Sequence, residues 1–229
     1  DPQLKIYHQL FDCNKKIKQW YWSVIFNEAY SSAVDSQLTS DFKELKEWFS
    51  NDEKIPSNVK EARTVMQTLK IRKSNVLSSA LNKGVLSLLA LKGSRDLKTG
   101  NMVNSGSEYH KDHIFPKSKS TEFKAGKDID SILNMALLTS NTNEVKKAKD
   151  PKKYFKELAE DFKGNKEEYL VVLDTHHISK EGFDFLLKND FEGFISTREK
   201  LLLNEVKKQI GWTEKDEISQ EEDDLDIRE

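Results

Sequence analysis

Asp112 and His113 stand next to each other in the segment Tyr109–Pro116, and their side chains suit hydrolytic chemistry. Hydrolysis of a phosphodiester needs a base that deprotonates water and a divalent cation that neutralises charge on the phosphorane. Histidine fits the first role because its ordinary pKa lies near neutrality. The carboxylate of Asp112 fits the second role as a hard oxygen ligand for magnesium. The pair therefore fits metal-assisted hydrolysis of a phosphodiester, although a surface strand end whose histidine hydrogen-bonds locally is the open alternative.

A second group of suitable side chains follows later in the chain, in a segment with a helix-start pattern. Asn141 followed by Glu144 is typical of an N-cap with its capping-box partner, which places Asn143 in the first turn of a helix. Asn143, Lys146 and Lys147 then share one face at spacings of three and four residues. This face offers an oxygen ligand for a metal and two ammonium groups for phosphate, although the lysines could equally be solvated surface.

We expect two strands and a helix to position these residues. The first strand is expected from about Glu108 to Phe115, the second at Asn134–Thr139, and the helix from near Asn141. Neighbouring residues of a strand point to opposite faces. Asp112 and His113 can therefore share one site only if the strand is bent or irregular there.

The three segments together resemble a known family, the HNH endonucleases with their ββα-metal fold. More narrowly, they resemble the nuclease domain of GmrSD-type, modification-dependent (type IV) restriction proteins, of which this chain would be the C-terminal part. The residues that carry this resemblance are Asp112-His113-Ile114-Phe115-Pro116-Lys117-Ser118, Asn134 with Leu137 and Leu138, Thr142-Asn143 with Lys146 and Lys147, and Pro151 with Tyr154. More diffuse similarity extends to Trp20–Phe26, Arg95-Asp96, and Phe191, Phe194, Ile195 and Arg198.

The resemblance implies a role for each residue of the motif. His113 would be the general base and Asp112 a metal ligand. Asn143 occupies the third signature position, as the second ligand, where such enzymes often carry His. An Asn there favours a hard cation over zinc, so we expect magnesium, with manganese as the alternative. Asn134 resembles the middle Asn, which supports catalysis by positioning the strand and the base rather than by touching the metal.

Further polar residues near the motif are candidates for contacts with nucleic acid. The predicted contacts are Lys117, Lys146, Lys147 and His110. His110 lies two residues before Asp112 and can share its face of the strand. A solvent-facing histidine is the open alternative. His176 and His177 are expected to be structural, because adjacent histidines in a helical stretch point in different directions and have no third partner in sequence.

Composition limits the classes of protein to which the chain can belong. The chain has 229 residues, 36% hydrophobic and 33% charged, which is enough for one or two compact domains. Cys13 is the only cysteine, which excludes an intramolecular disulfide and a cysteine-rich zinc site and favours a reducing cytoplasm. No apolar run approaches the roughly 20 residues that cross a bilayer. No Gly-rich phosphate loop of Walker type occurs, so nucleotide hydrolysis is not encoded in this chain.

The formal net charge of −2 hides a gradient along the chain. The segment Glu214–Glu229 contains nine acids against Lys215 and Arg228, a local net charge of −7. Since −2 minus −7 is +5, the rest of the chain carries about +5. The segment Lys111–Lys156 alone contains eleven lysines and six acids. The positive charge therefore lies beside the motif, where it does not repel nucleic acid.

We expect a mainly α fold with a small ββα-metal unit and helical flanking regions. The predicted segments are a helical domain at 1–100, the nuclease core at 101–155, C-terminal helices packing on the core at 156–212, and an acidic, disordered tail at 213–229. In the helical domain, Asp41 with Glu44 resembles a capping box that opens a helix. The chain begins at Asp1 without methionine, which suggests a fragment of a longer protein.

These patterns together predict a cytoplasmic, metal-dependent endonuclease that nicks or cuts DNA in bacterial defence against foreign or modified DNA. Its partners would be DNA and, by the resemblance, a nucleotide-hydrolysing sensor domain upstream in the full-length protein. Two alternatives stay open. A DNA-binding or interaction module without catalysis would use the lysines but not His113. An RNA nuclease would have the same residues and the same chemistry.

Overall fold

The computed structural model describes residues 2–73, 79–103, 109–162, 165–213 and 216, with only the backbone described for residues 2–8. Within these residues the chain forms nine α-helices and one antiparallel sheet of two strands, as the prediction of a mainly α fold requires. Nearly all of the predicted acidic tail lies outside the described residues. The elements are α1 Pro2–Phe26, α2 Val34–Ser50, α3 Ser57–Thr68, α4 Ala80–Leu91, β1 Tyr109–His113, β2 Met135–Thr139, α5 Ser140–Lys146, α6 Pro151–Asp161, α7 Lys166–Asp174, α8 Lys180–Lys188 and α9 Phe191–Gln209.

The chain divides into two compact units that differ from the predicted segments. The helical unit comprises Asp1–Leu69 and Asn204–Glu229, and the strand unit comprises Lys70–Leu203. Helix α4 therefore belongs with the strands, although the sequence placed it in a helical domain ending at residue 100. Helix α9 begins in the strand unit, and its last residues belong to the helical unit.

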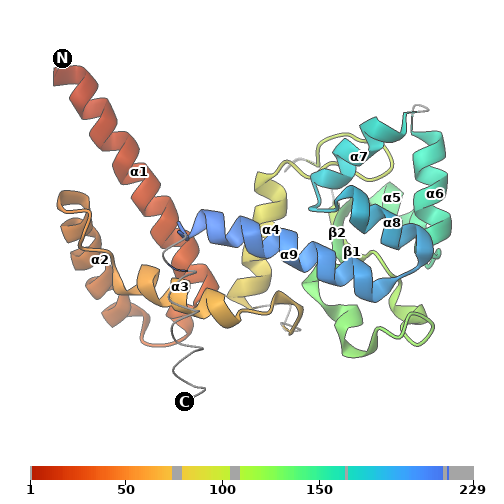
Figure 1. Ribbon diagram of the computed structural model, residues 1–229, viewed down its shortest axis with the longest axis horizontal. Helices are drawn as coiled ribbons and strands as arrows, with labels where there is room; N and C mark the ends of the chain where they lie inside the picture. Colours follow the sequence, from red (N-terminus) through yellow and green to blue (C-terminus); the bar gives the residue numbers. More distant parts are fainter. Residues whose placement is uncertain (1, 74–78, 104–108, 163–164, 214–215, 217–229) are drawn as a thin grey trace. The chain divides into compact units, whose positions relative to one another are not determined.

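In the helical unit α1 packs against α2 and α3 (Figure 1). The buried carboxylate of Asp41 joins the three helices. The predicted capping box at Asp41 is wrong, because α2 begins at Val34 and Asp41 lies inside the helix. The Asp41 carboxylate accepts hydrogen bonds from Trp20 Nε1 at 3.2 Å and from Asn58 Nδ2 at 2.7 Å. Glu44 instead accepts hydrogen bonds from Ser57 at the start of α3. Spacing alone does not distinguish a cap from a buried acceptor.

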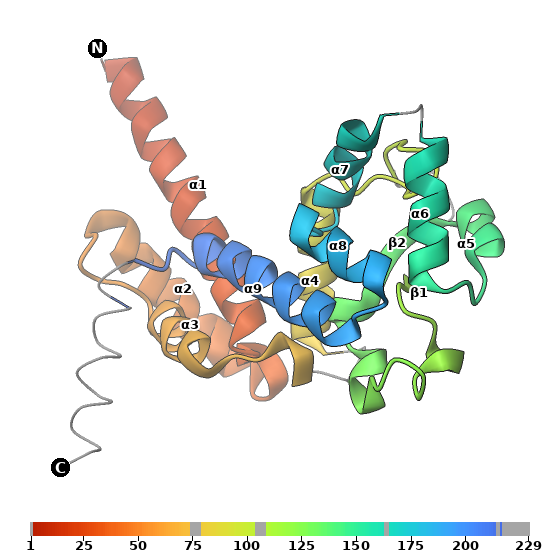
Figure 2. The ribbon, with the colours of Figure 1, turned by 45° about the vertical axis from the view of Figure 1, so that its right-hand side comes forward.

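In the strand unit the two strands lie between α4 and α6 in both views (Figures 1 and 2). His113 pairs with Met135 and Tyr109 with Thr139 at the two ends of the ladder. The first four residues of β2 are buried, whereas β1 is exposed or partly exposed along its length. One strand therefore builds the core while the other presents polar side chains. The strands lie where the sequence predicts them, although β1 ends at His113 and Glu108 lies outside the described residues.

An aromatic cluster directly after β1 anchors the connection between the strands. Phe115 is fully buried, and its ring centroid lies 5.0 Å from that of Phe123 and 5.2 Å from that of Phe191. Phe194 adds a further ring at 5.6 Å. Because Phe191 and Phe194 lie on α9, this helix holds the backbone that follows His113. Aromatic pairs at these distances stabilise a core beyond the area that they bury.

A buried guanidinium on α9 holds the backbone at the start of β2. Arg198 donates hydrogen bonds to the carbonyls of Leu133 and Met135, each at 2.7 Å, and to that of His176 at 3.0 Å. No carboxylate among the described residues forms an ion pair with it, and burial lowers the pKa of Arg198 to about 9. The charge is therefore balanced by carbonyl dipoles that lie on both sides of Asn134.

We expect Arg198→Met to lower the free energy of unfolding by about 2–4 kcal/mol, because it leaves buried carbonyls without donors. The matched control is Lys200→Met on the exposed side of the same helix, which we expect to change this value by less than about 0.5 kcal/mol. Urea unfolding of both variants measures the difference. Equal stability of the two variants would exclude a clamping role for Arg198.

Candidate active site on the two strands

The candidate site lies at the end of β1, where His113 and Asp112 are both partly exposed. Their side chains are 24% and 25% exposed, so both are accessible to a ligand while anchored in the sheet. His113 Nε2 lies 3.0 Å from Asp130 Oδ1 in the connection between the strands. Asp112 Oδ2 lies 2.7 Å from Lys146 Nζ, at the end of α5. Each residue of the pair is thus engaged by a different partner.

Asp130 is a site residue that the sequence did not reveal. Its other oxygen, Oδ2, accepts a hydrogen bond from Lys117 Nζ at 2.6 Å. The Lys117 ammonium in the first place, and His113 in addition, hold the pKa of the Asp130 carboxyl below its ordinary value against the opposing effect of desolvation. Asp128, two residues earlier, pairs with Arg72 instead. No local pattern separates these two acids, because the difference lies in their distant partners.

The ionised Asp130 determines how His113 can act. A carboxylate only accepts hydrogen bonds, so Nε2 of a neutral His113 carries the proton and points it at Asp130. The lone pair of Nδ1 is then the position that can accept a proton from water. After such a transfer, Asp130 would stabilise the positive imidazolium. The geometry suits a general base with an orienting carboxylate.

Asn134 joins the backbone on either side of this pair. It is fully buried, and its Oδ1 accepts a hydrogen bond from the Phe115 N–H at 2.8 Å. Its Nδ2 donates to the carbonyls of Phe115 at 3.0 Å and Ile129 at 2.8 Å. Phe115 follows His113 by two residues, and Ile129 directly precedes Asp130. Asn134 therefore fixes the backbone next to His113 and next to Asp130, while its own side chain is buried beneath the site.

Helix α5 begins earlier than the sequence predicts, and a buried carboxylate explains the difference. Thr139, not Asn141, is the N-cap, with its side chain accepting from the Thr142 N–H. Asp96 Oδ2 accepts hydrogen bonds from the Thr139 N–H at 3.0 Å and its hydroxyl at 2.9 Å. Asp96 Oδ1 accepts from the Thr142 hydroxyl at 2.7 Å. Asp96, in the loop after α4, is therefore a second positioning residue that local patterns did not identify.

The predicted common face of Asn143, Lys146 and Lys147 is wrong. The helix ends at Lys146, and Lys147 follows with a φ of +47° and an exposed side chain. The Lys146 side chain is only 2% exposed and reaches Asp112. Asn143 is partly exposed, and its side chain forms no hydrogen bond with any described residue. Lys146 is therefore not free to contact phosphate in this arrangement, whereas Lys147 is.

The remaining predicted residues divide into exposed and buried ones. Lys117 is 64% exposed, and exposed His110 lies 3.0 Å from the Ser140 hydroxyl through its Nε2. Both can meet a ligand at the surface. His176 and His177 are buried, and burial lowers the pKa of each to about 4. His176 Nε2 lies 2.6 Å from the Arg95 carbonyl, as suits the structural role expected of this pair.

A divalent metal would have few protein ligands at this site. Within the described ranges, no group of three or more His, Cys, Asp or Glu side chains is arranged to hold a metal ion. The available donors are the Asp112 carboxylate and the Asn143 amide oxygen on α5, which packs against β1. Such a set fits magnesium, which keeps several waters and takes one or two carboxylates together with substrate phosphates. It does not fit tetrahedral zinc.

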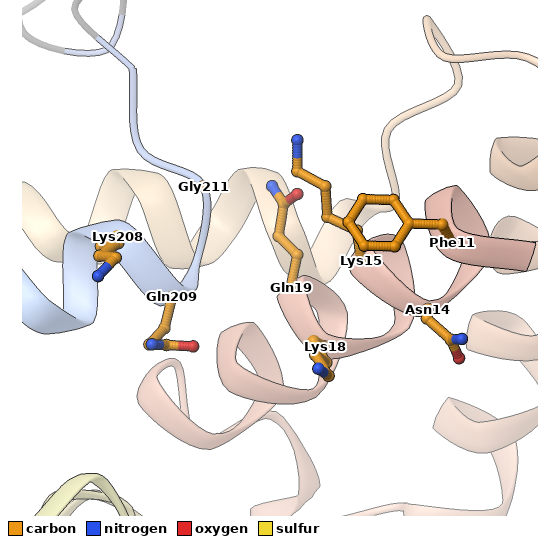
Figure 3. A pocket seen from close by; sticks show the side chains of 8 residues that line it. All are labelled: Phe11, Asn14, Lys15, Lys18, Gln19, Lys208, Gln209 and Gly211. Carbon is orange, nitrogen blue, oxygen red and sulfur yellow. The ribbon is translucent and has the colours of Figure 1, made fainter. Parts of the chain in front are cut away.

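The helical unit contains a hollow that is not lined by any residue of the candidate site. Its volume is about 550 Å³, and Figure 3 shows Phe11 and Lys15 of α1 beside it together with residues at the end of α9. The cationic residues that line it are Lys15, Lys18 and Lys208. None of the predicted site residues lines this hollow.

Comparison with known proteins shows similarity to an archaeal protein. An uncharacterized protein of Methanocaldococcus jannaschii is 33% identical over 221 residues, which cover 87% of this chain and 38% of that protein. The chain thus spans less than half the length of this relative. No protein-family model and no solved structure matches the chain. Among the described helices, none combines the length and the apolar character needed to cross a membrane.

The Asp96 network predicts a pH-dependent contribution to stability. Burial raises the pKa of Asp96, but the hydrogen bonds, led by that from the Thr139 N–H, outweigh burial and leave the pKa below its ordinary value. A depressed carboxyl pKa stabilises the fold above the pKa of the unfolded chain, about 3.9, and this contribution is lost as the pH falls through the folded value.

We therefore expect Asp96→Asn to lower the free energy of unfolding at pH 7 by about 2–4 kcal/mol, and by less at pH 3. Asp161→Asn, an exposed acid at the end of α6, is the matched control and should be near neutral at both pH values. Chemical denaturation at the two pH values gives the comparison. A loss that is the same at pH 3 and pH 7 would contradict an ionised Asp96.

Proposed function

We propose that the strand unit is an HNH-type, metal-dependent endonuclease that hydrolyses DNA, with His113 as the general base. One observation carries the proposal: the partly exposed His113 ring is held through Nε2 by an ionised carboxylate, while the adjacent Asp112 lies within reach of a ligand. The order of β1, β2 and α5 supports a ββα-metal unit, and the side-chain hydrogen bonds of Asn134 support its assignment as the positioning residue.

The chemistry follows from the roles of these side chains. A divalent metal held by Asp112 and Asn143 would neutralise negative charge that develops on the phosphate. His113 Nδ1 takes a proton from a water molecule, whose oxygen forms a bond to phosphorus while the bond to the leaving sugar oxygen breaks. The leaving oxygen acquires a proton from solvent, and His113 returns its own proton to solvent. Asp130 orients the ring and stabilises its charged form. Lys117, Lys147 and His110 lie at the surface, where they can contact the phosphate backbone.

The wider biological setting is part of the same proposal. The relative from Methanocaldococcus jannaschii extends well beyond the matched region, which supports a longer protein with further domains. By the resemblance to GmrSD-type proteins, an upstream nucleotide-hydrolysing domain would control cleavage of foreign or modified DNA in the cytoplasm. Target choice would then reside largely outside the strand unit.

One observation favours a second candidate, a nucleic-acid-binding module without catalysis. Asp112 is already paired with Lys146, which occupies the carboxylate that a metal would need. Binding to duplex DNA through exposed lysines requires neither Asp112 nor His113. Cleavage assays distinguish this candidate from the nuclease.

The decisive experiment incubates the full chain with unmodified or base-modified plasmid, and in parallel with RNA, in magnesium, manganese or chelator. We expect metal-dependent cleavage of DNA that His113→Ala, Asp112→Ala and Asn143→Ala each reduce by about 100-fold or more. Tyr109→Ala, an exposed residue of the same strand with no assigned role, is the matched control, with a change of less than about threefold.

Cleavage that His113→Ala leaves intact would remove this residue from its role. Binding of DNA without cleavage in any metal would favour the binding module. Cleavage of RNA but not of DNA would identify the chain as an RNA nuclease with the same chemistry.

The role of Asp130 can be tested independently. We expect Asp130→Asn to lower kcat by about 10- to 100-fold without raising KM, because it removes the charge that orients His113 and leaves the Lys117 ammonium available to phosphate. Asp130→Glu should restore part of kcat. Asp128→Asn, in the same turn but directed at Arg72, is the control and should leave kcat unchanged. A KM effect without a kcat effect would assign Asp130 to binding instead.

A further inference from the structure

Lys146 occupies an unusual position, because its ammonium group forms an ion pair with the Asp112 carboxylate, the proposed metal ligand. The distance from Lys146 Nζ to Asp112 Oδ2 is 2.7 Å, and the lysine side chain is 2% exposed. Lysine is almost never fully buried unless it is paired. Within the described residues, Asp112 is the one hydrogen-bond acceptor of this ammonium. The buried charge of Lys146 is therefore balanced by Asp112.

The backbone holds Lys146 in this position. Thr142 and Lys146, four residues apart, form the buried face of α5. Asp96 binds Thr142 and the N-cap Thr139, so the start of the helix is anchored in the core. The helix then ends directly after Lys146. Because Thr142 lies on the same face as Lys146, a rotation of the helix that carried the ammonium away from Asp112 would break the hydrogen bond between Thr142 and Asp96.

We infer that the Lys146 ammonium, which forms an ion pair with Asp112, competes with a divalent metal ion for this carboxylate. The metal ion would therefore bind weakly until a phosphate group enters the site. The inference rests on the proposed function only in taking Asp112 as a metal ligand. Two cations at one carboxylate repel each other, and this repulsion is strong where solvent screens poorly. A phosphate brings negative charge that both cations can share. Metal binding and nucleic-acid binding would then be coupled, with each favouring the other.

The adjacent Lys147 makes this inference testable. Lys146→Met and Lys147→Met remove the same charge from neighbouring positions, one buried on Asp112 and the other exposed. A purely structural Lys146 would affect stability but would not raise the affinity for metal. A competing Lys146 predicts that its removal strengthens metal binding at Asp112.

The experiment measures Mn²⁺ binding to the full chain by electron paramagnetic resonance of the free ion, without nucleic acid. We expect Lys146→Met to tighten binding by about tenfold or more, and Lys147→Met to change it by less than about threefold. Adding Asp112→Asn to Lys146→Met should abolish the gain. A short duplex DNA should tighten Mn²⁺ binding to the unaltered chain more than to Lys146→Met.

Circular dichroism establishes that each variant is folded. If Lys146→Met does not fold, Lys146→Gln replaces it, because the glutamine amide can still donate a hydrogen bond to Asp112. We expect this variant also to bind Mn²⁺ more tightly than the unaltered chain. Lys146→Arg keeps the charge and should leave the affinity weak. Unchanged or weaker Mn²⁺ binding in the neutral variants, or equal shifts at Lys146 and Lys147, would overturn the inference.

The two proposals can fail separately. Cleavage that depends on His113, combined with no gain in Mn²⁺ affinity, would leave the nuclease intact and remove the role of Lys146. The expected Mn²⁺ shifts without cleavage of any substrate would establish the competition at Asp112 and count against the nuclease.

Discussion

The candidate site depends on the hydrogen bonds that the side-chain amide of Asn134 forms with the backbone. The connection between β1 and β2 must bring Asp130 back to His113, and Asn134 binds the backbone next to both residues. An amide has both donors and an acceptor, so one side chain can bind an N–H and two carbonyls at once. A carboxylate or an ammonium of similar size has only one of these functions. The fixed position of His113 thus follows from the hydrogen-bonding capacity of a single buried residue.

Around this contact, buried charges are balanced mainly by neutral groups. Arg198 donates to backbone carbonyls on both sides of Asn134, and Asp96 accepts from N–H and hydroxyl groups at the start of α5. Neither forms an ion pair with a described residue. Removing one partner of such a network leaves a desolvated charge, which costs more than the net value of the bonds themselves. These two residues therefore hold the elements that carry the site in one arrangement.

Lys146 differs from both, because it is held by one carboxylate that also faces the surface. The Asp112–Lys146 pair links the end of α5 to β1 and places a positive charge where a metal would bind. The consequence is a site with few permanent ligands, in which water and substrate phosphate would complete the coordination of a hard cation. Under the proposed function, such a site would gain its full ligand set only when nucleic acid is bound. This property would suit the proposed nuclease if another domain controlled its activity.

Local periodicity in the sequence determined the helices and the strands. Phe191, Phe194, Ile195, Leu202 and Val206 recur at helical spacing within the segment where C-terminal helices were expected, and all five residues are buried on α9. The strand order and the adjacency of Asp112 and His113 were likewise readable, because helix and strand periods are properties of consecutive residues. Partners far apart in the chain were not. Asp130 meets His113 across 17 residues, Lys146 meets Asp112 across 34, and Asp96 meets Thr139 across 43. Lys146 and Lys147 are chemically identical neighbours, and only the tertiary structure, which ends the helix between them, decided that one is buried against Asp112 and the other exposed.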